Sequence, residues 1–245
     1  MENCYAHVLG DCSNKLSKEH YISQALLKLS EPDPGRVKLA GDFANAKPRG
    51  TQNLAQKRML CTQHNSELSA VDAEMVSLAQ AIYEWGRSDR NIAVSVDGAL
   101  LTRWLFKFAI GQMWATVGKE LIPQALLSKD CLEFVFGRTP LPIWCGFEAS
   151  GPTEHTNSVI NQRGGAPAYI TSILRQPNGE PCGSQIALYP LEFFTLFRPT
   201  KASQSGSFRL DEISVETENR SKVLSIVVSW PEPTGRCMRI TTSVQ

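Results

Sequence analysis

The chain has 245 residues, of which 42% are hydrophobic and 20% charged, and its formal net charge is +1. This length suits one large domain or two smaller ones with hydrophobic cores of their own. The near-neutral charge excludes a uniformly basic nucleic-acid-binding surface, so any site for a polyanion has to be local. The seven cysteines lack framework spacing, and no N-terminal apolar run or membrane-length segment is present. We therefore expect a reduced, cytoplasmic protein that does not enter a membrane.

The first 30 residues begin with soft metal ligands. Cys4, His7 and Cys12 lie within this segment. Residues 16–22 then predict a short strand, and Ser23 marks the start of a brief helix.

Residues 31–57 contain several glycines and prolines, which predict a loop, and the charge of this part of the chain is strongly biased. Between residues 36 and 58 six basic side chains face a single acidic one, Asp42, which leaves a local charge of +5. The six basic residues are Arg36, Lys38, Lys47, Arg49, Lys57 and Arg58. Two interpretations remain open: a solvated loop, or a set of contacts to the phosphates of a nucleic acid.

The next segment pairs two metal ligands with a helix. Cys61 and His64 are three residues apart, a spacing at which a tight turn directs both side chains at one ion. Asn65 and Ser66 are N-cap residue types, and the helix expected over residues 65–86 has apolar positions that recur every three or four residues.

A structural zinc site follows from these ligands. Cys61 and His64 supply two of them and Cys4 a third, and the fourth is either His7 or Cys12. Four sulfur and nitrogen ligands make a closed tetrahedral Zn²⁺ site without an open position for substrate. The alternative is that these cysteines are ordinary buried residues.

A carboxylate and an imidazole stand next to each other at the end of the first strand, as Glu19 and His20. A hard divalent cation prefers the carboxylate, and a neutral imidazole can take a proton from water near neutral pH. Asp72 and Glu74 on the helix can each offer a second oxygen ligand. The alternative for the first pair is a surface ion pair at a strand end.

Together these segments resemble the zinc-knuckle HNH endonucleases, which have a ββα-metal core. The resemblance covers residues 1 to about 85 and includes Leu16-Ser-Lys-Glu-His-Tyr-Ile-Ser23 and Leu60-Cys-Thr-Gln-His-Asn65. It implies that Glu19 binds a catalytic divalent ion, Mg²⁺ or Mn²⁺. It also implies that His20 is the general base, that Asn65 orients this base, and that Asp72 or Glu74 completes the metal site.

The chain departs from the family pattern in three places. The second ligand pair is CxxH where CxxC is usual, and the helix carries carboxylates where His or Asn is more common. The segment between His20 and Cys61 is also longer than a minimal core needs, which suggests an inserted loop that faces DNA.

The remainder of the chain resembles no family. Residues 88–90 form a polar break, which we take as the boundary between domains at 1–88 and 89–245. Beyond it we expect helices over residues 100–117 and 123–136.

Six β-branched and aromatic runs separated by turn residues then predict strands. They span residues 141–147, 168–174, 185–197, 207–215, 223–230 and 236–244. This pattern is typical of an antiparallel sheet.

The sequence thus predicts an α+β protein with an N-terminal HNH-like core and a mainly antiparallel second domain. The second domain is expected to bind the substrate or a regulatory protein. The expected function is metal-dependent cleavage or nicking of DNA, with RNA as an alternative substrate. A small HNH-like protein with an unfamiliar second domain fits a role in a bacterial or phage defence system. The competing hypothesis is a non-catalytic, zinc-stapled module that binds a protein or nucleic acid.

Overall fold

The computed structural model describes residues 3–29, 56–154, 156–157, 169–200, 208–219 and 221–242. These residues form a mixed α+β structure, as the sequence predicted, with one two-stranded and two four-stranded sheets. Within these ranges no helix has both the length and the apolar character that crossing a bilayer requires.

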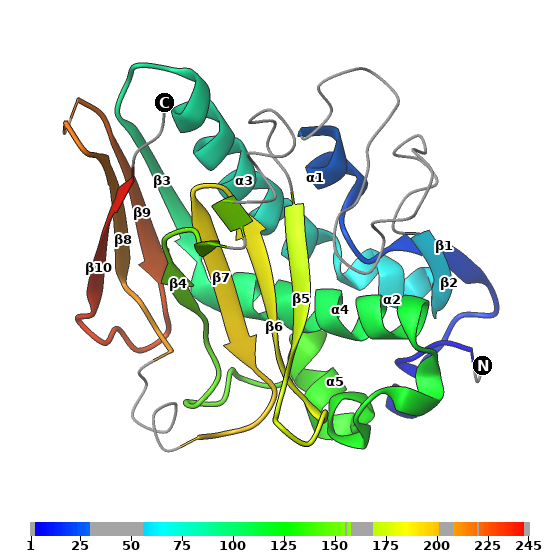
Figure 1. Cartoon of the computed structure of the whole chain (residues 1–245). Coiled ribbons are helices and arrows are strands. Elements are labelled where there is room, and N and C mark those ends of the chain that lie inside the picture. The colour runs from blue at the N-terminus through cyan, green and yellow to red at the C-terminus, as the bar shows by residue number, and fades with distance from the viewer. Residues whose placement is uncertain are drawn as a thin grey trace.

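The N-terminal part contains an antiparallel pair of strands, β1 and β2 (the hairpin), with helix α1 between them in the chain and α2 and α3 after them. Strands β1 and β2 pair antiparallel, with His20 opposite Gln56 and an irregular register between Ser17 and Glu19. The elements, in chain order, are η1 (His7–Leu9), β1 (Leu16–His20), α1 (Gln24–Leu29), β2 (Gln56–Cys61), α2 (Thr62–Glu67) and α3 (Ser69–Arg87). The hairpin lies at one end of the molecule, near the N-terminus (Figure 1).

The single helix expected over residues 65–86 is instead two helices, α2 and α3, which meet at Leu68. Helix α2 begins at Thr62, so Asn65 and Ser66 lie inside it and do not cap it. Its first turn is capped from a distant segment, because the Gln63 N–H donates to Ser13 Oγ at 3.2 Å.

The chain after residue 88 contributes a second 19-residue helix and both four-stranded sheets. Its helices are α4 (Gly98–Thr116), η3 (Lys119–Leu121), η4 (Gln124–Leu127) and α5 (Lys129–Val135). Its strands are β3 (Ile92–Asp97), β4 (Glu148–Ser150), β5 (Tyr169–Arg175), β6 (Pro181–Leu188), β7 (Leu191–Leu196), β8 (Glu212–Thr217), β9 (Val223–Ser229) and β10 (Cys237–Thr242). The helix expected over residues 123–136 is divided into η4 and α5, because Ser128 caps a new helix by accepting the Cys131 N–H at 3.3 Å.

The strands after residue 88 form two sheets, and one of these two is wholly antiparallel. Strands β4, β7, β6 and β5 pair antiparallel in that order. In the other sheet the order is β10, β8, β9 and β3, and the pairs β10–β8 and β3–β9 are parallel. Strand β3, which the sequence analysis did not predict, makes the second parallel pair, although Ile92, Val94 and Val96 alternate as a strand requires.

The run over residues 141–147 is not a strand, contrary to the prediction. The buried guanidinium of Arg209 donates to the carbonyl oxygens of Pro142 at 2.9 Å and Cys145 at 3.2 Å. This segment therefore satisfies its backbone carbonyls with a side chain instead of a neighbouring strand.

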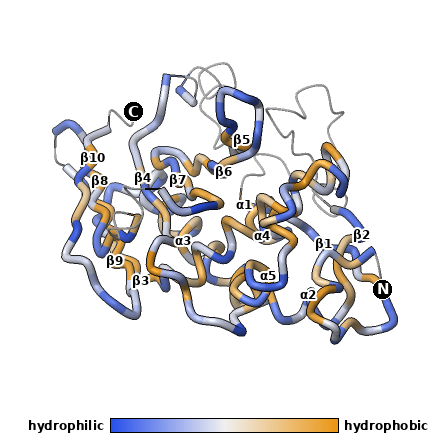
Figure 2. The backbone as a smooth tube through the Cα atoms, turned by 90° about the horizontal axis from the view of Figure 1, so that it is seen from below, coloured by the Kyte–Doolittle hydropathy of each residue, from blue (hydrophilic) through white to orange (hydrophobic). Residues whose placement is uncertain are grey.

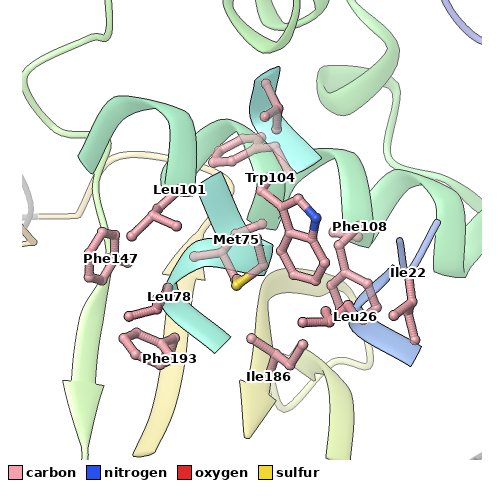
Figure 3. Packing of buried hydrophobic residues seen from close by; sticks show 14 of the residues in the cluster. Ile22, Leu26, Met75, Leu78, Leu101, Trp104, Phe108, Phe147, Ile186 and Phe193 are labelled. Atoms are coloured by element: carbon pink, nitrogen blue, oxygen red, sulfur yellow. The ribbon is translucent and has the colours of Figure 1, made fainter. Parts of the chain in front are cut away.

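Helix α4 is the centre of the hydrophobic core. It contacts α3, α5 and strands of all three sheets, and most of its residues are buried. A helix buried on most sides is mostly apolar, and much of α4 has the hydrophobic colour in Figure 2. Figure 3 shows Trp104 and Phe108 of α4 among side chains from other elements, and their rings stack with centroids 5.4 Å apart.

Two glycines allow α4 to approach its neighbours closely. A Cβ at Gly98 would lie 2.6 Å from the Trp230 ring, and one at Gly111 would lie 2.3 Å from the Cβ of Tyr21. Helix α4 therefore joins the N-terminal hairpin to the β10–β3 sheet, and buried residues from both sides of the predicted boundary at residue 88 share one hydrophobic cluster.

Candidate metal centre and the adjacent ion cluster

Four soft ligands from three segments converge at the base of the hairpin. Cys4, Cys12, Cys61 and His64 offer ligand atoms that all lie within 4.8 Å of one another. The distances from His64 Nδ1 to the three sulfur atoms are 3.5 Å for Cys4, 3.7 Å for Cys12 and 3.2 Å for Cys61. Ligands of one tetrahedral zinc are separated by roughly 3.3–3.8 Å, so this cluster could hold a metal ion.

The fourth position, left open by the sequence, is taken by Cys12. His7 is exposed and its Nδ1 lies 3.1 Å from the carbonyl oxygen of Cys4. Residues 7–9 form the short helix η1, which carries His7 away from the cluster while the chain returns to it at Cys12.

The thiols of the cluster differ in acidity. Burial raises the pKa of Cys4 to about 12. Burial also acts to raise the pKa of Cys61, but hydrogen bonds from the His64 backbone and from Ser13 outweigh it and lower this pKa to about 6. The Cys61 thiol is therefore the most acidic of the three, and the thiolate is the form of cysteine that binds a metal.

The carboxylate of Asp11 forms a hydrogen bond with the ring of His64. Its Nε2 donates to Asp11 Oδ1 at 2.9 Å, which leaves Nδ1 for the metal. Arg138, just after α5, in turn contacts Asp11 at 2.7 Å and Glu67 at 2.9 Å. Although Asp11, His64 and Glu67 are close enough to form a second ligand group, Arg138 already pairs with both carboxylates, so we assign them to the support of His64.

A second convergence lies between β1, α3 and α4. Lys107 Nζ is 2.7 Å from Glu19 Oε1 and 2.7 Å from each carboxylate oxygen of Asp72. The indole N–H of Trp104 also donates to Asp72 Oδ1 at 3.1 Å. Two carboxylates that are distant in sequence thus surround one cationic group (the ion cluster).

Burial governs the electrostatics of the ion cluster. The Lys107 side chain is 1% exposed, Glu19 is 4% exposed and Asp72 is 28% exposed. Burial alone would lower the pKa of Lys107, but the two carboxylates reverse this shift and raise it. Burial raises the pKa of Glu19, and the nearby ammonium opposes only part of that shift.

The other residues named for catalysis have different environments. Glu74 accepts the backbone N–H of Asp97 at 2.6 Å and so supports the start of α4. His20 follows Glu19 at the end of β1 and is partly buried. Asn65 is partly buried on α2, where its carbonyl oxygen accepts the Leu68 N–H at 3.3 Å.

The basic segment can be placed only in part. Lys57 and Arg58 are exposed on β2, and Lys57 lies opposite Glu19 in the hairpin. The other predicted phosphate contacts, Arg36, Lys38, Lys47 and Arg49, lie outside the described residues.

Three residues of these sites were missed by the sequence analysis: Asp11, Lys107 and Arg138. Lys107 had a usable signal, because it stands between Phe106 and Phe108 in a stretch, residues 104–111, that is otherwise apolar. A charge in such a position needs a buried partner. Asp11 and Arg138 had no comparable signal, since exposed charges are common at loop positions.

No family model, curated protein or solved structure matches this chain.

Proposed function

We propose that this protein is a zinc-stapled, metal-dependent endonuclease or nickase that hydrolyses phosphodiester bonds of DNA, with an HNH-like N-terminal core. The observation that carries the proposal is the convergence of Glu19 and Asp72 on one cation position. The resemblance expects these two segments to share a catalytic metal, and nothing in their spacing along the chain requires the carboxylates to meet.

The zinc assignment rests on the ligand set. Three thiols and one imidazole favour Zn²⁺, and an inner shell without an open position points to a structural role. This staple would tie the N-terminal segment to the start of α2 immediately beside the β1–β2 hairpin.

The ion cluster offers a test of whether a catalytic cation would fit. The ammonium of Lys107 acts as a stand-in ion, and its position shows that the carboxylates of Glu19 and Asp72 can surround a single positive charge. Magnesium is commonly held by one or two carboxylates together with water and phosphate oxygens. When bound, such an ion would supply Lewis-acid stabilisation of the phosphate during hydrolysis.

The side chains of the hairpin supply the remaining roles. Glu19 and Asp72 would hold the cation, and His20 would take a proton from the attacking water. Asn65 would brace the segment that carries this base. Lys57 and Arg58, exposed on the neighbouring strand, would position the DNA backbone through its phosphates.

The test is a supercoiled-plasmid assay with Mg²⁺ or Mn²⁺ that compares wild type with His20→Ala. His7→Ala is a matched control, because it removes an exposed histidine that lies outside the metal centre. We expect wild type and His7→Ala to nick or linearise the plasmid and His20→Ala to be inactive. Equal cutting by all three proteins would contradict the assignment of His20.

A non-catalytic, zinc-stapled binding module is the second candidate, and the ion cluster favours it in one respect. Lys107 already neutralises part of the charge of Glu19 and Asp72, as it would in a purely structural ion cluster. Experiments can distinguish the two functions. A binding module would bind DNA or a protein partner but would not cut the plasmid, whether or not His20 is present.

A further inference from the structure

A cation already lies where the proposed function requires one. Lys107 comes from α4, in the part of the chain that follows residue 88, and its ammonium reaches Glu19 on β1 and Asp72 on α3. We propose that Lys107 is a built-in competitor for this site and that it sets the affinity of Glu19 and Asp72 for a divalent cation. This inference rests on the proposed function, because it concerns the same two carboxylates.

The charges of the ion cluster support competition. Two carboxylates and one ammonium leave a net charge of −1, whereas two carboxylates and one divalent cation are neutral. If Lys107 stayed in place, an incoming divalent cation would stand a few ångströms from a buried ammonium, and the repulsion would be strong in so dry an environment. The two cations therefore exclude each other.

The geometry also shows from which side an ion would arrive. Asp72 is 28% exposed, whereas Glu19 and Lys107 are almost fully buried. A hydrated cation would first meet Asp72 and would then have to displace the ammonium to reach Glu19. Divalent ions give up their water reluctantly, so the resident ammonium adds to an existing barrier.

Trp104 provides a direct probe of this step. Its indole N–H donates to Asp72 Oδ1 at 3.1 Å, so a Tb³⁺ ion bound by Asp72 would lie close enough for energy transfer from the excited indole. Terbium prefers hard oxygen ligands and serves as the luminescent substitute for Mg²⁺ or Mn²⁺. The experiment titrates Tb³⁺ into zinc-loaded wild type, Lys107→Met and the double variant Lys107→Met/Asp72→Asn, with Mn²⁺ as the competing ion.

We expect Lys107→Met to bind Tb³⁺ about tenfold or more tightly than wild type, because removing a charge at contact distance removes the repulsion. The double variant should lose this gain, since it lacks the more accessible carboxylate. Equal affinities for wild type and Lys107→Met would overturn the proposal. Tight binding that persists in the double variant would also overturn it, because the ion would then occupy another site.

Stability provides a second readout, since Lys107→Met leaves the buried carboxylate of Glu19 and the partly buried one of Asp72 without a counter-ion. Thermal unfolding with and without Mn²⁺ should show a higher midpoint for Lys107→Met when the ion is present and little change for wild type. If the variant is unfolded, refolding with Mn²⁺ should restore its native circular dichroism. Failure of Mn²⁺ to stabilise or refold it would mean that Lys107 is only a structural partner.

The plasmid assay keeps the two proposals apart. Tight Tb³⁺ binding by Lys107→Met without any DNA cutting would support the competitor and contradict the nuclease. Cutting by wild type with no change in ion affinity would support the nuclease and contradict the competitor.

Discussion

The metal centre and the ion cluster are both convergent, buried sets of side chains, but they are built from different parts of the chain. The ligands Cys4, Cys12, Cys61 and His64 all come from the first 64 residues. The ion cluster instead needs Lys107 from α4. The metal centre is thus local to the N-terminal part, whereas the ion cluster exists only when the hairpin packs against the rest of the protein. This difference can be tested by variants of each region.

Removal of the metal should have the largest effect. Cys61→Ala should lose bound zinc and unfold the N-terminal part, because binding to a structural site contributes roughly 10–16 kcal/mol at neutral pH. Metal analysis should find about one zinc per chain in wild type, and circular dichroism should report the unfolding. Cys237→Ala is the matched control, since this cysteine is exposed and outside the cluster. If wild type contains no metal and is still fully folded, the cluster is not a structural zinc site.

One added methyl group is enough to disturb the packing of α4 on the hairpin. Gly111→Ala would place a Cβ 2.3 Å from the Cβ of Tyr21, so we expect a loss of about 1–3 kcal/mol in the free energy of unfolding. Gly86→Ala is a matched control in another helix, because no atom lies within 4 Å of its added Cβ. This control should be neutral or stabilising by up to about 1 kcal/mol, and chemical denaturation measures both. Equal stability of the two variants would indicate that α4 does not approach Tyr21 closely.

The support behind His64 should tune the metal centre without destroying it. Arg138→Ala frees Asp11 and Glu67, and we expect zinc affinity to fall by about tenfold, the lower end of the range for outer-shell partners. Competition with a zinc chelator measures this affinity. Arg90→Ala, which breaks an exposed ion pair with Glu84, should leave it unchanged. If Arg138→Ala binds zinc as tightly as wild type, the contacts of Arg138 do not contribute to the metal centre.

The exposed basic residues of the hairpin should produce the smallest effect. If Lys57 contacts a phosphate, Lys57→Ala should weaken DNA binding uniformly across sequences and reduce the salt slope by about one. Binding titrations at several salt concentrations measure this slope. Lys129→Ala removes an exposed lysine on α5 and should leave the slope intact. A slope that Lys57→Ala does not alter would identify the basic run as a solvated surface.

Local sequence determined the features that depend on short spacing. The three-residue interval between Cys61 and His64 placed two ligands on one ion position, and the apolar period indicated a helix that the structure resolves as α2 and α3. The α+β class followed from the change from helical to alternating patterns near residue 137.

Only the tertiary structure could choose among residues that are equivalent in sequence. Asp72 and Glu74 are two positions apart on α3 and therefore point to opposite sides of the helix. The packing of α4 gives them different partners, because Lys107 contacts Asp72 whereas Glu74 accepts the Asp97 N–H at the start of α4. The choice of Cys12 over His7 likewise depended on the path of the chain through η1.

The strand pattern shows the same limit. Alternation can reveal that a run is extended, but the direction of its partner depends on residues far away in sequence. Strand β3 has the alternation of a strand, but nothing local indicates that it pairs parallel to β9, and residues 141–147 bond to Arg209 in place of a sheet. Spacing along the chain determined which side chains could act together, and long-range packing decided which of them meet, because only packing sets the distances between segments that are remote in sequence.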